Sequence, residues 1–163
     1  MVRSIGVSNF NSEQIERVIQ GSSTVPAVNQ VESHPFLSNE KLFQFCRQRG
    51  IHLVAYSPLA RTGTSEKKNT TSPLDIPLIK DLAAKYNVTP AAICIKWQTQ
   101  RGVIVIQKSA TKERIISNIN IFHFDLTTEE VEAISAVDKN WRNCTFSDFG
   151  INKHKEWPFA VEF

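Results

Sequence analysis

The sequence predicts an α/β protein built around a parallel sheet. Short apolar runs alternate with amphipathic stretches along most of the 163 residues, as in strands that are joined by crossover helices. The strands predicted from these runs are short and carry apolar side chains on both faces, which is typical of buried parallel strands. With 41% hydrophobic and 21% charged residues, the composition is that of an ordinary globular chain with a hydrophobic core.

Four strand–helix units follow one another along the chain. The predicted strands are residues 4–8, 27–31, 51–56 and 103–106, and the predicted helices are residues 11–21, 38–50, 77–86, 90–100, one that begins at 111, and 127–137. Asn11 and Gln14 have the spacing of a capping box, which marks the start of the first helix. Thr127 and Glu130 repeat that spacing at the last helix. Residues 138–163 lack clear periodicity and are expected to form a tail.

The number of units predicts how much of a known architecture the chain supplies. A closed barrel of eight strand–helix units takes ~250 residues, so four units correspond to about half of one. We therefore expect a partial (β/α)8 TIM barrel, with residues 1–163 as a single half-barrel domain. A small, open, doubly wound sheet is the alternative, and the absence of a glycine-rich turn after the first strand counts against it.

Composition excludes several classes of function. The formal net charge is only +3 and the basic residues are spread along the chain, which argues against a nucleic-acid partner. No apolar stretch approaches the ~20 residues of a membrane-spanning helix, and no secretion signal opens the sequence. Three cysteines and four histidines show neither disulfide nor metal-ligand spacing. We expect a cytoplasmic protein without a metal site or a membrane partner.

Polar side chains stand at the ends of all four predicted strands. They lie in the segments IGVSNF (5–10), VNQVESHP (28–35), AYSPLA (55–60) and VIQKSAT (105–111). In a β/α barrel the carboxyl ends of the strands form the active face. In this order, and together with the ending NWRNC (140–144), WPF (157–159) and EF (162–163), the segments resemble the aldo-keto reductase family, and in particular its aldose-reductase-like members. The resemblance implies that the strands are the fifth to eighth of that barrel.

The same resemblance implies a site for NADPH. The implied contacts are Ser8, Asn9 and Gln30 with the nicotinamide carboxamide, Tyr56 with the nicotinamide ring, Ser57 and Leu59 with the pyrophosphate, Lys108, Ser109, Thr111 and Arg114 with the phosphate groups, and Asn118 with the adenine. Asparagine and glutamine supply both the donors and the acceptors that an amide needs. Without the family, Asn9 could equally end a turn, Gln30 could satisfy the barrel backbone, and Tyr56 could be a core residue.

Arg114 has a physical argument of its own. Thr111 is expected to cap the helix that follows the last strand, which puts Arg114 in the first turn. A cation is unfavourable at the amino terminus of a helix, so Arg114 there calls for an anionic partner. A 2′-phosphate would provide one and would favour NADPH over NADH. The alternative is a solvated surface arginine.

The tail matches the substrate loop of the family at Trp141, Cys144 and Phe146. A loop of this kind closes the pocket and sets specificity, and such loops vary most. Trp141 could equally be an anchor that packs the tail onto the barrel.

The sequence also departs from the family pattern. The Asp, Tyr, Lys and His that carry the family's chemistry come from the first half of its barrel, and nothing here aligns with them. Gln107 stands where proline is usual, Ser117 where an acidic residue is usual, and Gly63 where an acidic residue helps to hold the cofactor. We therefore expect a truncated chain without catalytic residues that is inactive alone.

Two functions remain open at this stage. One is an NADPH-dependent reductase of aldehyde or ketone carbonyls, of which this chain is one part. The other is a non-catalytic half-barrel that binds dinucleotide or only self-associates. Unpaired sheet edges favour pairing with a further chain, so two copies could form a homodimer with two-fold symmetry.

Overall fold

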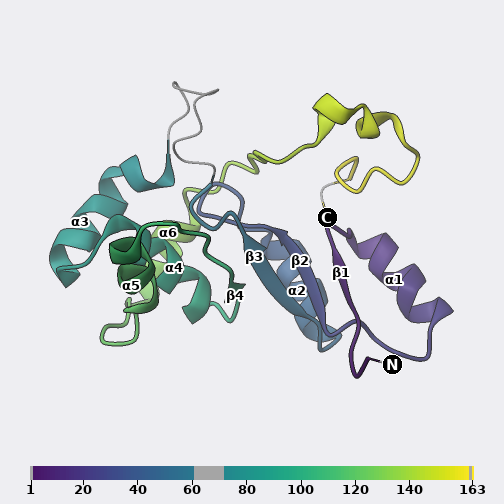
Figure 1. The fold of residues 1–163 in the computed structure, drawn as a ribbon, viewed down its shortest axis with the longest axis horizontal. Helices are drawn as coiled ribbons and strands as arrows, with labels where there is room; N and C mark the ends of the chain where they lie inside the picture. Colours follow the sequence, from purple (N-terminus) through teal and green to yellow (C-terminus); the bar gives the residue numbers. More distant parts are fainter. Residues whose placement is uncertain (1, 61–71, 162) are drawn as a thin grey trace.

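One parallel sheet organises the molecule. The computed structural model describes residues 2–60, 72–161 and 163. Its strands β1 (Gly6–Ser8), β2 (Val28–Glu32), β3 (His52–Tyr56) and β4 (Ile104–Val105) are neighbours in chain order, and every pair is parallel (Figure 1). This confirms the predicted α/β class and the strand–helix order.

Helices connect consecutive strands, as a parallel sheet requires. The α-helices are α1 (Ser12–Gly21), α2 (Glu40–Gln48), α3 (Pro77–Tyr86), α4 (Pro90–Gln100), α5 (Lys112–Ile119) and α6 (Thr128–Ser135), with short 3-10 turns at Pro73–Asp75, Ser147–Phe149 and Ile151–Lys153. Helices α3 to α6 gather beyond β4, whereas α1 lies beside β1 at the opposite end (Figure 1). Both predicted capping boxes are present, at the amino termini of α1 and α6.

The register brings the ends of the strands together. Val28 is level with Gly6 on one side and with His52 on the other, and Val54 is level with Ile104. Gly6 permits the close approach of β1 to β2, because a Cβ there would lie 2.6 Å from Cγ2 of Val28. The carboxyl ends of all four strands therefore meet at one edge of the sheet, where the polar segments were predicted to converge.

The core forms two apolar clusters. One lies between the sheet and helices α1 and α2 and includes Ile15, Val31, Phe43 and Leu53. The other surrounds α4, whose residues are buried from Ala92 to Gln98, and includes Ile79, Ile93, Trp97, Phe124 and Ile134. A helix that is buried on all sides cannot show an apolar stripe, so α4 acts as the central helix of its cluster.

At three of the predicted boundaries the local structure differs from the expectation. Helix α2 begins at Glu40, not at Ser38; the Ser38 hydroxyl donates to the carboxylate of Asp138 in the tail and accepts a hydrogen bond from the N–H of Glu40 at 3.3 Å. The strand predicted at 103–106 keeps two residues. Thr111 precedes α5 without a side-chain capping bond; instead its main-chain N–H donates to the Ser109 hydroxyl at 3.3 Å.

The tail runs past the carboxyl ends of the strands from α6 to α1 (Figure 1). At its start, the main-chain N–H groups of Lys139 and Trp141 donate to the carbonyl oxygen of Phe36. Near its end, Gln14 of α1 donates to the carbonyl oxygen of Glu156 at 2.9 Å. The tail is therefore held at both ends by the half-barrel that it crosses.

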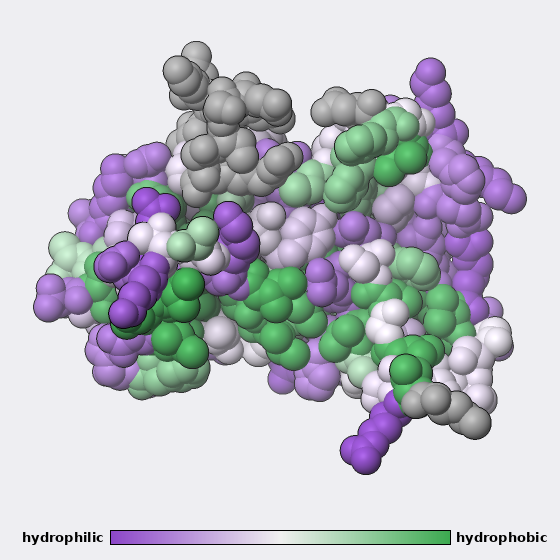
Figure 2. Space-filling view, viewed as in Figure 1, coloured by the Kyte–Doolittle hydropathy of each residue, from purple (hydrophilic) through white to green (hydrophobic). Residues whose placement is uncertain are grey.

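Large apolar side chains remain exposed at the edges of the sheet and on α5. Ile104 and Ile106 at β4 are each 45% exposed, and Ile119 and Phe122 at the end of α5 are 69% and 80% exposed. Figure 2 shows hydrophobic side chains over β4 and α5 on this face of the molecule. Exposed apolar groups of this extent usually mark a surface that another element covers.

None of the described helices is both long and apolar enough to cross a bilayer.

Candidate functional site

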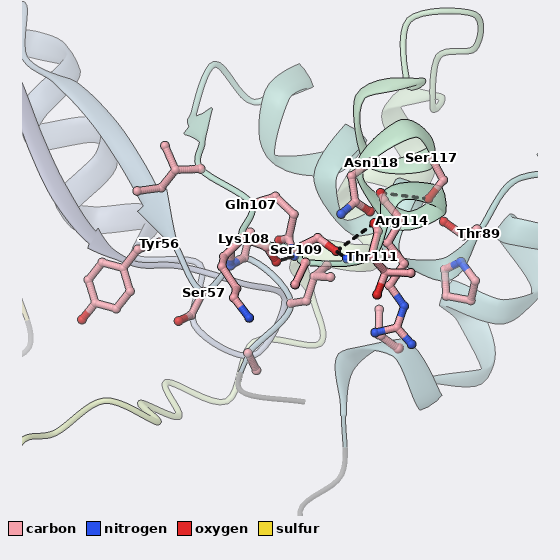
Figure 3. A pocket seen from close by; sticks show the side chains of 18 residues that line it. Tyr56, Ser57, Thr89, Gln107, Lys108, Ser109, Thr111, Arg114, Ser117 and Asn118 are labelled. Atoms are coloured by element: carbon pink, nitrogen blue, oxygen red, sulfur yellow. Dashed lines mark hydrogen bonds between the residues drawn. The ribbon is translucent and has the colours of Figure 1, made fainter. Parts of the chain in front are cut away.

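A cavity of about 950 Å³ lies at the carboxyl ends of β3 and β4 (Figure 3). Its walls come from the loop after β3, from the segment between β4 and α5, and from the first residues of α4 and α5. Of the residues predicted to bind the cofactor, those that line it are Tyr56, Ser57, Leu59, Lys108, Ser109, Thr111, Arg114 and Asn118. The fold thus brings residues 56–60 and 106–118, which are distant in the sequence, to one cavity.

The loop after β3 owes its shape to an unusual backbone. Ser57 and Ala60 have φ values of 48° and 56°, a left-handed region that residues other than glycine rarely adopt. The N–H of Ala60 donates to the carbonyl oxygen of Ser57 at 2.8 Å and closes the turn. Strained backbone of this kind is concentrated at functional sites, and here it forms one wall of the cavity.

Two helices present their amino termini to the cavity. Thr89 caps α4 by accepting a hydrogen bond from the N–H of Ala92, and Thr89 and Pro90 both line the cavity. Thr111 and Arg114 line it from the start of α5. The first N–H groups of a helix lack partners within the helix, and the helix dipole favours an anion there. This end of the cavity is therefore suited to phosphate.

Two cations reinforce that preference. Lys108 and Arg114 extend to the same side of the cavity (Figure 3) and are exposed. Within the part of the chain that the structure describes, neither forms an ion pair with a carboxylate. Their charges are therefore available to an anionic ligand.

Of the residues predicted at the nicotinamide end, Ser8, Asn9 and Gln30 do not line the cavity, whereas Tyr56 does. The N–H of Asn9 and the hydroxyl of Ser8 both donate to the carbonyl oxygen of Gln30, each at 2.9 Å. The hydroxyl of Tyr56 lies 3.1 Å from Oδ1 of Asn9 and donates to it. Tyr56, which does line the cavity, thus joins this group to the rest of the site. It lies at the opposite end from Arg114 and Asn118 (Figure 3).

Asn29 is a positioning residue that sequence reasoning did not single out. Its side chain is fully buried, and its amide donates to the carbonyl oxygen of Phe10 at 2.9 Å and accepts from the N–H of the same residue at 3.4 Å. These bonds fix the turn in which Asn9 has a φ of 57°. An amide inside an apolar strand was visible in the sequence, but its partner was not.

The cavity also contains residues at which the sequence departs from the family pattern. Gln107 lines it, and its Oε1 atom is buried without a hydrogen-bond partner among the described residues. Ser117 lines it as well, but its hydroxyl donates to the carbonyl oxygen of Arg114 at 3.1 Å. Gly63 lies outside the described residues.

The predicted substrate residues are not in the walls of this cavity. Trp141 is half-buried, and its ring lies 5.9 Å from that of His34 and 6.3 Å from that of Phe36, so it anchors the tail. Cys144 lies close enough to Tyr56 to affect its electrostatics. Phe146 is exposed and has a φ of 57°.

Tyr56 is held in its protonated form. Burial raises the pKa of its hydroxyl well above the ordinary value, and the nearby Cys144 and Glu32 raise it further, although Arg142 and the bond to Asn9 act in the opposite direction. A hydroxyl with a raised pKa that already donates to Asn9 is a hydrogen-bond donor to its neighbours and a poor source of a proton for a reaction.

The parallel sheet, its crossover helices and the tail that crosses the strand ends define part of a β/α-barrel protein. The sequence model of the Aldo/keto reductase family matches residues 1–139. The chain belongs to that family.

Known relatives are similar to this chain over most or all of its length. It is 42% identical over 167 positions to a prostaglandin-E(2) 9-reductase of Oryctolagus cuniculus, an alignment that covers 100% of this chain and 51% of that protein. It is 43% identical over 146 positions to aldo-keto reductase family 1 member A1 of Homo sapiens, covering 87% of this chain and 44% of that protein. The chain spans about half the length of these curated relatives.

A solved relative shows the same fold. An aldo-keto reductase of Bombyx mori, in complex with NADP, superposes with a TM-score of 0.88 at 39% identity, over 96% of this chain and 50% of that one. The predicted partial barrel is thus confirmed.

Proposed function

We propose that this chain is the cofactor-binding half of an NADPH-dependent aldo-keto reductase, which reduces the carbonyl group of aldehydes or ketones. The observation that carries the proposal is the cavity itself. It is lined by two helix amino termini, by two cations that have no carboxylate partner among the described residues, and by Tyr56, which hydrogen-bonds Asn9 and through it adjoins Gln30. The relative from Bombyx mori in complex with NADP supports the choice of cofactor.

The residues present fit the two ends of a phosphorylated dinucleotide. At one end, Lys108 and Arg114 would hold the 2′-phosphate, with Ser109 and Thr111 beside them and Asn118 at the adenine. Arginine suits a phosphate because its planar group donates two parallel hydrogen bonds. Ser57 and Leu59 would line the pyrophosphate.

At the other end, Ser8, Asn9 and Gln30 would hydrogen-bond the nicotinamide carboxamide, and the half-buried ring of Tyr56 would stack on the nicotinamide. When bound, NADPH supplies the hydride that reduces the carbonyl carbon. The role of this half of the barrel is therefore to hold and orient the nicotinamide.

The tail would add a wall to the substrate pocket of the whole enzyme. We assign Trp141, Cys144 and Phe146 to this wall, and the nearness of Cys144 to Tyr56 supports the assignment. The small-molecule carbonyl substrate and the cytoplasmic location both stay predictions.

Titration of the purified chain with NADPH and with NADH tests the cofactor site directly. We expect NADPH to bind at least about tenfold more tightly, because one charged hydrogen bond contributes about 1.5–3 kcal/mol and NADH lacks the 2′-phosphate. Quenching of tryptophan fluorescence or the emission of the bound cofactor measures both affinities. Equal binding of the two cofactors, or binding of neither, would contradict the proposal.

A second candidate role is favoured by the exposed apolar surfaces. Ile104, Ile106, Ile119 and Phe122 would be covered if β4 and α5 of one copy met β1 of another. We therefore predict that a polypeptide of these 163 residues, expressed alone, forms homodimers or larger assemblies by hydrophobic association. Sedimentation velocity measures this, with I119S and F122S together as the comparison. A stable, monodisperse monomer at tens of micromolar would contradict the prediction.

A further inference from the structure

A buried carboxylate at the end of β2 holds the tail by its main chain. Glu32 is fully buried, and its two oxygens accept hydrogen bonds from the N–H groups of Asn143 at 2.9 Å and Cys144 at 2.7 Å. The ring nitrogen Nε2 of His34, also fully buried, lies 3.1 Å from the same carboxylate. The two bonds to the main chain of Asn143 and Cys144 join residues more than a hundred positions apart in the sequence.

The carboxylate is ionised despite its burial. Burial alone would raise the pKa of Glu32, but the hydrogen bonds from His34 and from the main chain of Cys144 and Asn143 outweigh it, so that the pKa is lowered from its ordinary value. A buried charge is tolerated only where hydrogen bonds replace its lost water. Glutamine at this position would lose the charge and one of the two acceptor oxygens, which leaves a single oxygen for the N–H groups of both Asn143 and Cys144.

The hydrogen bonds of Glu32 to Asn143 and Cys144 hold the tail further along its path than the other contacts with the sheet do. Earlier anchors lie at Ser38, which bonds Asp138, and at Phe36. Beyond Cys144, the hydrogen bonds that the structure describes are local to the tail until Glu156 meets α1. Glu32 is thus the last anchor on the sheet before the tail leaves it.

The segment of the tail that Glu32 holds, residues 142–144, lies near Tyr56. Glu32 and Tyr56 are level in the register of β2 and β3. Cys144, Arg142 and Glu32 all contribute to the electrostatic surroundings of the Tyr56 hydroxyl. The guanidinium carbon of Arg142 lies 3.9 Å from the ring centre of Phe159.

We propose that Glu32 is a positioning residue for the nicotinamide end of the site: its carboxylate fixes the main chain of Asn143 and Cys144 and so sets the tail against Tyr56. The part that concerns the nicotinamide rests on the proposed function. The part that concerns the tail rests only on the hydrogen bonds above.

The first test measures the reactivity of Cys144 in Glu32→Gln. Cys46 and Cys94 are both fully buried, and burial raises their pKa values to about 11 and about 12, so Cys144 dominates the reaction with an aromatic disulfide reagent. We expect the rate at Cys144 to rise at least about tenfold, because the lost acceptor releases the segment. Glu32→Asp keeps the charge and should give an intermediate rate.

The second test separates positioning from a general loss of structure. Binding of NADPH should weaken about fivefold or more in Glu32→Gln, whereas binding of 2′-phospho-ADP-ribose, which lacks the nicotinamide, should stay as in the parent chain. The control is Glu16→Gln, which removes a surface carboxylate paired with Arg49 at 2.9 Å and should leave both measurements unchanged.

Each outcome decides between the alternatives. An unchanged Cys144 rate in folded Glu32→Gln, or in Glu32→Asp if the first variant fails to fold, overturns the positioning of the tail. Equal weakening of both nucleotides shows a merely structural role and overturns the proposal for the nicotinamide. A parent chain that binds neither nucleotide refutes the proposed function and that part of the inference, while the thiol rate still decides the part on the tail.

Discussion

Replacement of Arg114 by alanine is expected to weaken NADPH binding by about 10- to 100-fold and to leave NADH binding nearly unchanged. Arg114 lies in the first turn of α5, lines the cavity and has no carboxylate partner among the described residues. A charged hydrogen bond to phosphate contributes about 1.5–3 kcal/mol, and every 1.4 kcal/mol is about tenfold in affinity. Fluorescence titration of both cofactors measures the effect.

A neighbouring lysine provides the matched control. Lys112 is exposed and belongs to the same helix, but it does not line the cavity. Lys112→Ala removes the same charge and should change NADPH affinity by less than about threefold, since an exposed charge acts only through a screened field. If both variants lost affinity equally, Arg114 would contribute general electrostatics only. If Arg114→Ala lost NADH as strongly as NADPH, the 2′-phosphate would not be its partner.

Local signals explain why so much of the fold could be predicted from the sequence. Capping boxes, such as Thr127 with Glu130, depend on residues three apart, and the structure forms them as expected. The parallel order of the strands follows from the helices that lie between them. The roles of Tyr56, Lys108 and Arg114 were implied by the resemblance to the aldo-keto reductase family, and the three residues line one cavity because strand ends converge in a parallel sheet.

Contacts between distant residues account for what the sequence did not reveal. Ser38 is of a residue type that caps helices, and its hydroxyl does accept from the N–H of Glu40, but its bond to Asp138, a hundred residues away, could not be predicted. Glu32 looked like one polar residue among several in its segment, and its role follows only from the path of the tail. Asn29 likewise needs the turn at Phe10 to show what it holds. The periodic pattern of apolar residues does not reveal such pairs of residues, because they are distant in the sequence.

The same limit applies to Gln107 and Ser117. Their departure from the family pattern was visible, but its consequence depends on geometry. Oε1 of Gln107 is buried in the cavity wall without a partner among the described residues, so it is an acceptor that a ribose hydroxyl or adenine amino group could satisfy. The Ser117 hydroxyl bonds the main chain of its own helix, which leaves the side chain of Asn118 as the polar group of that turn that is available in the cavity.

A polypeptide of these 163 residues alone is expected to show no measurable reduction of aldehydes, even at NADPH concentrations that saturate it. Reduction requires a proton donor within reach of the carbonyl oxygen, and a general acid contributes about 10²- to 10⁴-fold. Tyr56 has a raised pKa and donates its hydrogen to Asn9. Tyr86 lies on α3, where its hydroxyl bonds Glu130 at 2.6 Å, and it does not line the cavity.

Oxidation of NADPH in the presence of a simple aldehyde, followed by its absorbance, measures this rate against a blank without protein. Comparing NADPH binding with turnover separates the two proposed properties: this half of the barrel would orient the nicotinamide, whereas the proton would come from groups outside it. A robust aldehyde-dependent rate would contradict the prediction, and Tyr56→Phe would then identify the donor. Loss of that rate with unchanged NADPH affinity would assign the proton to Tyr56, against the direction of its pKa shift.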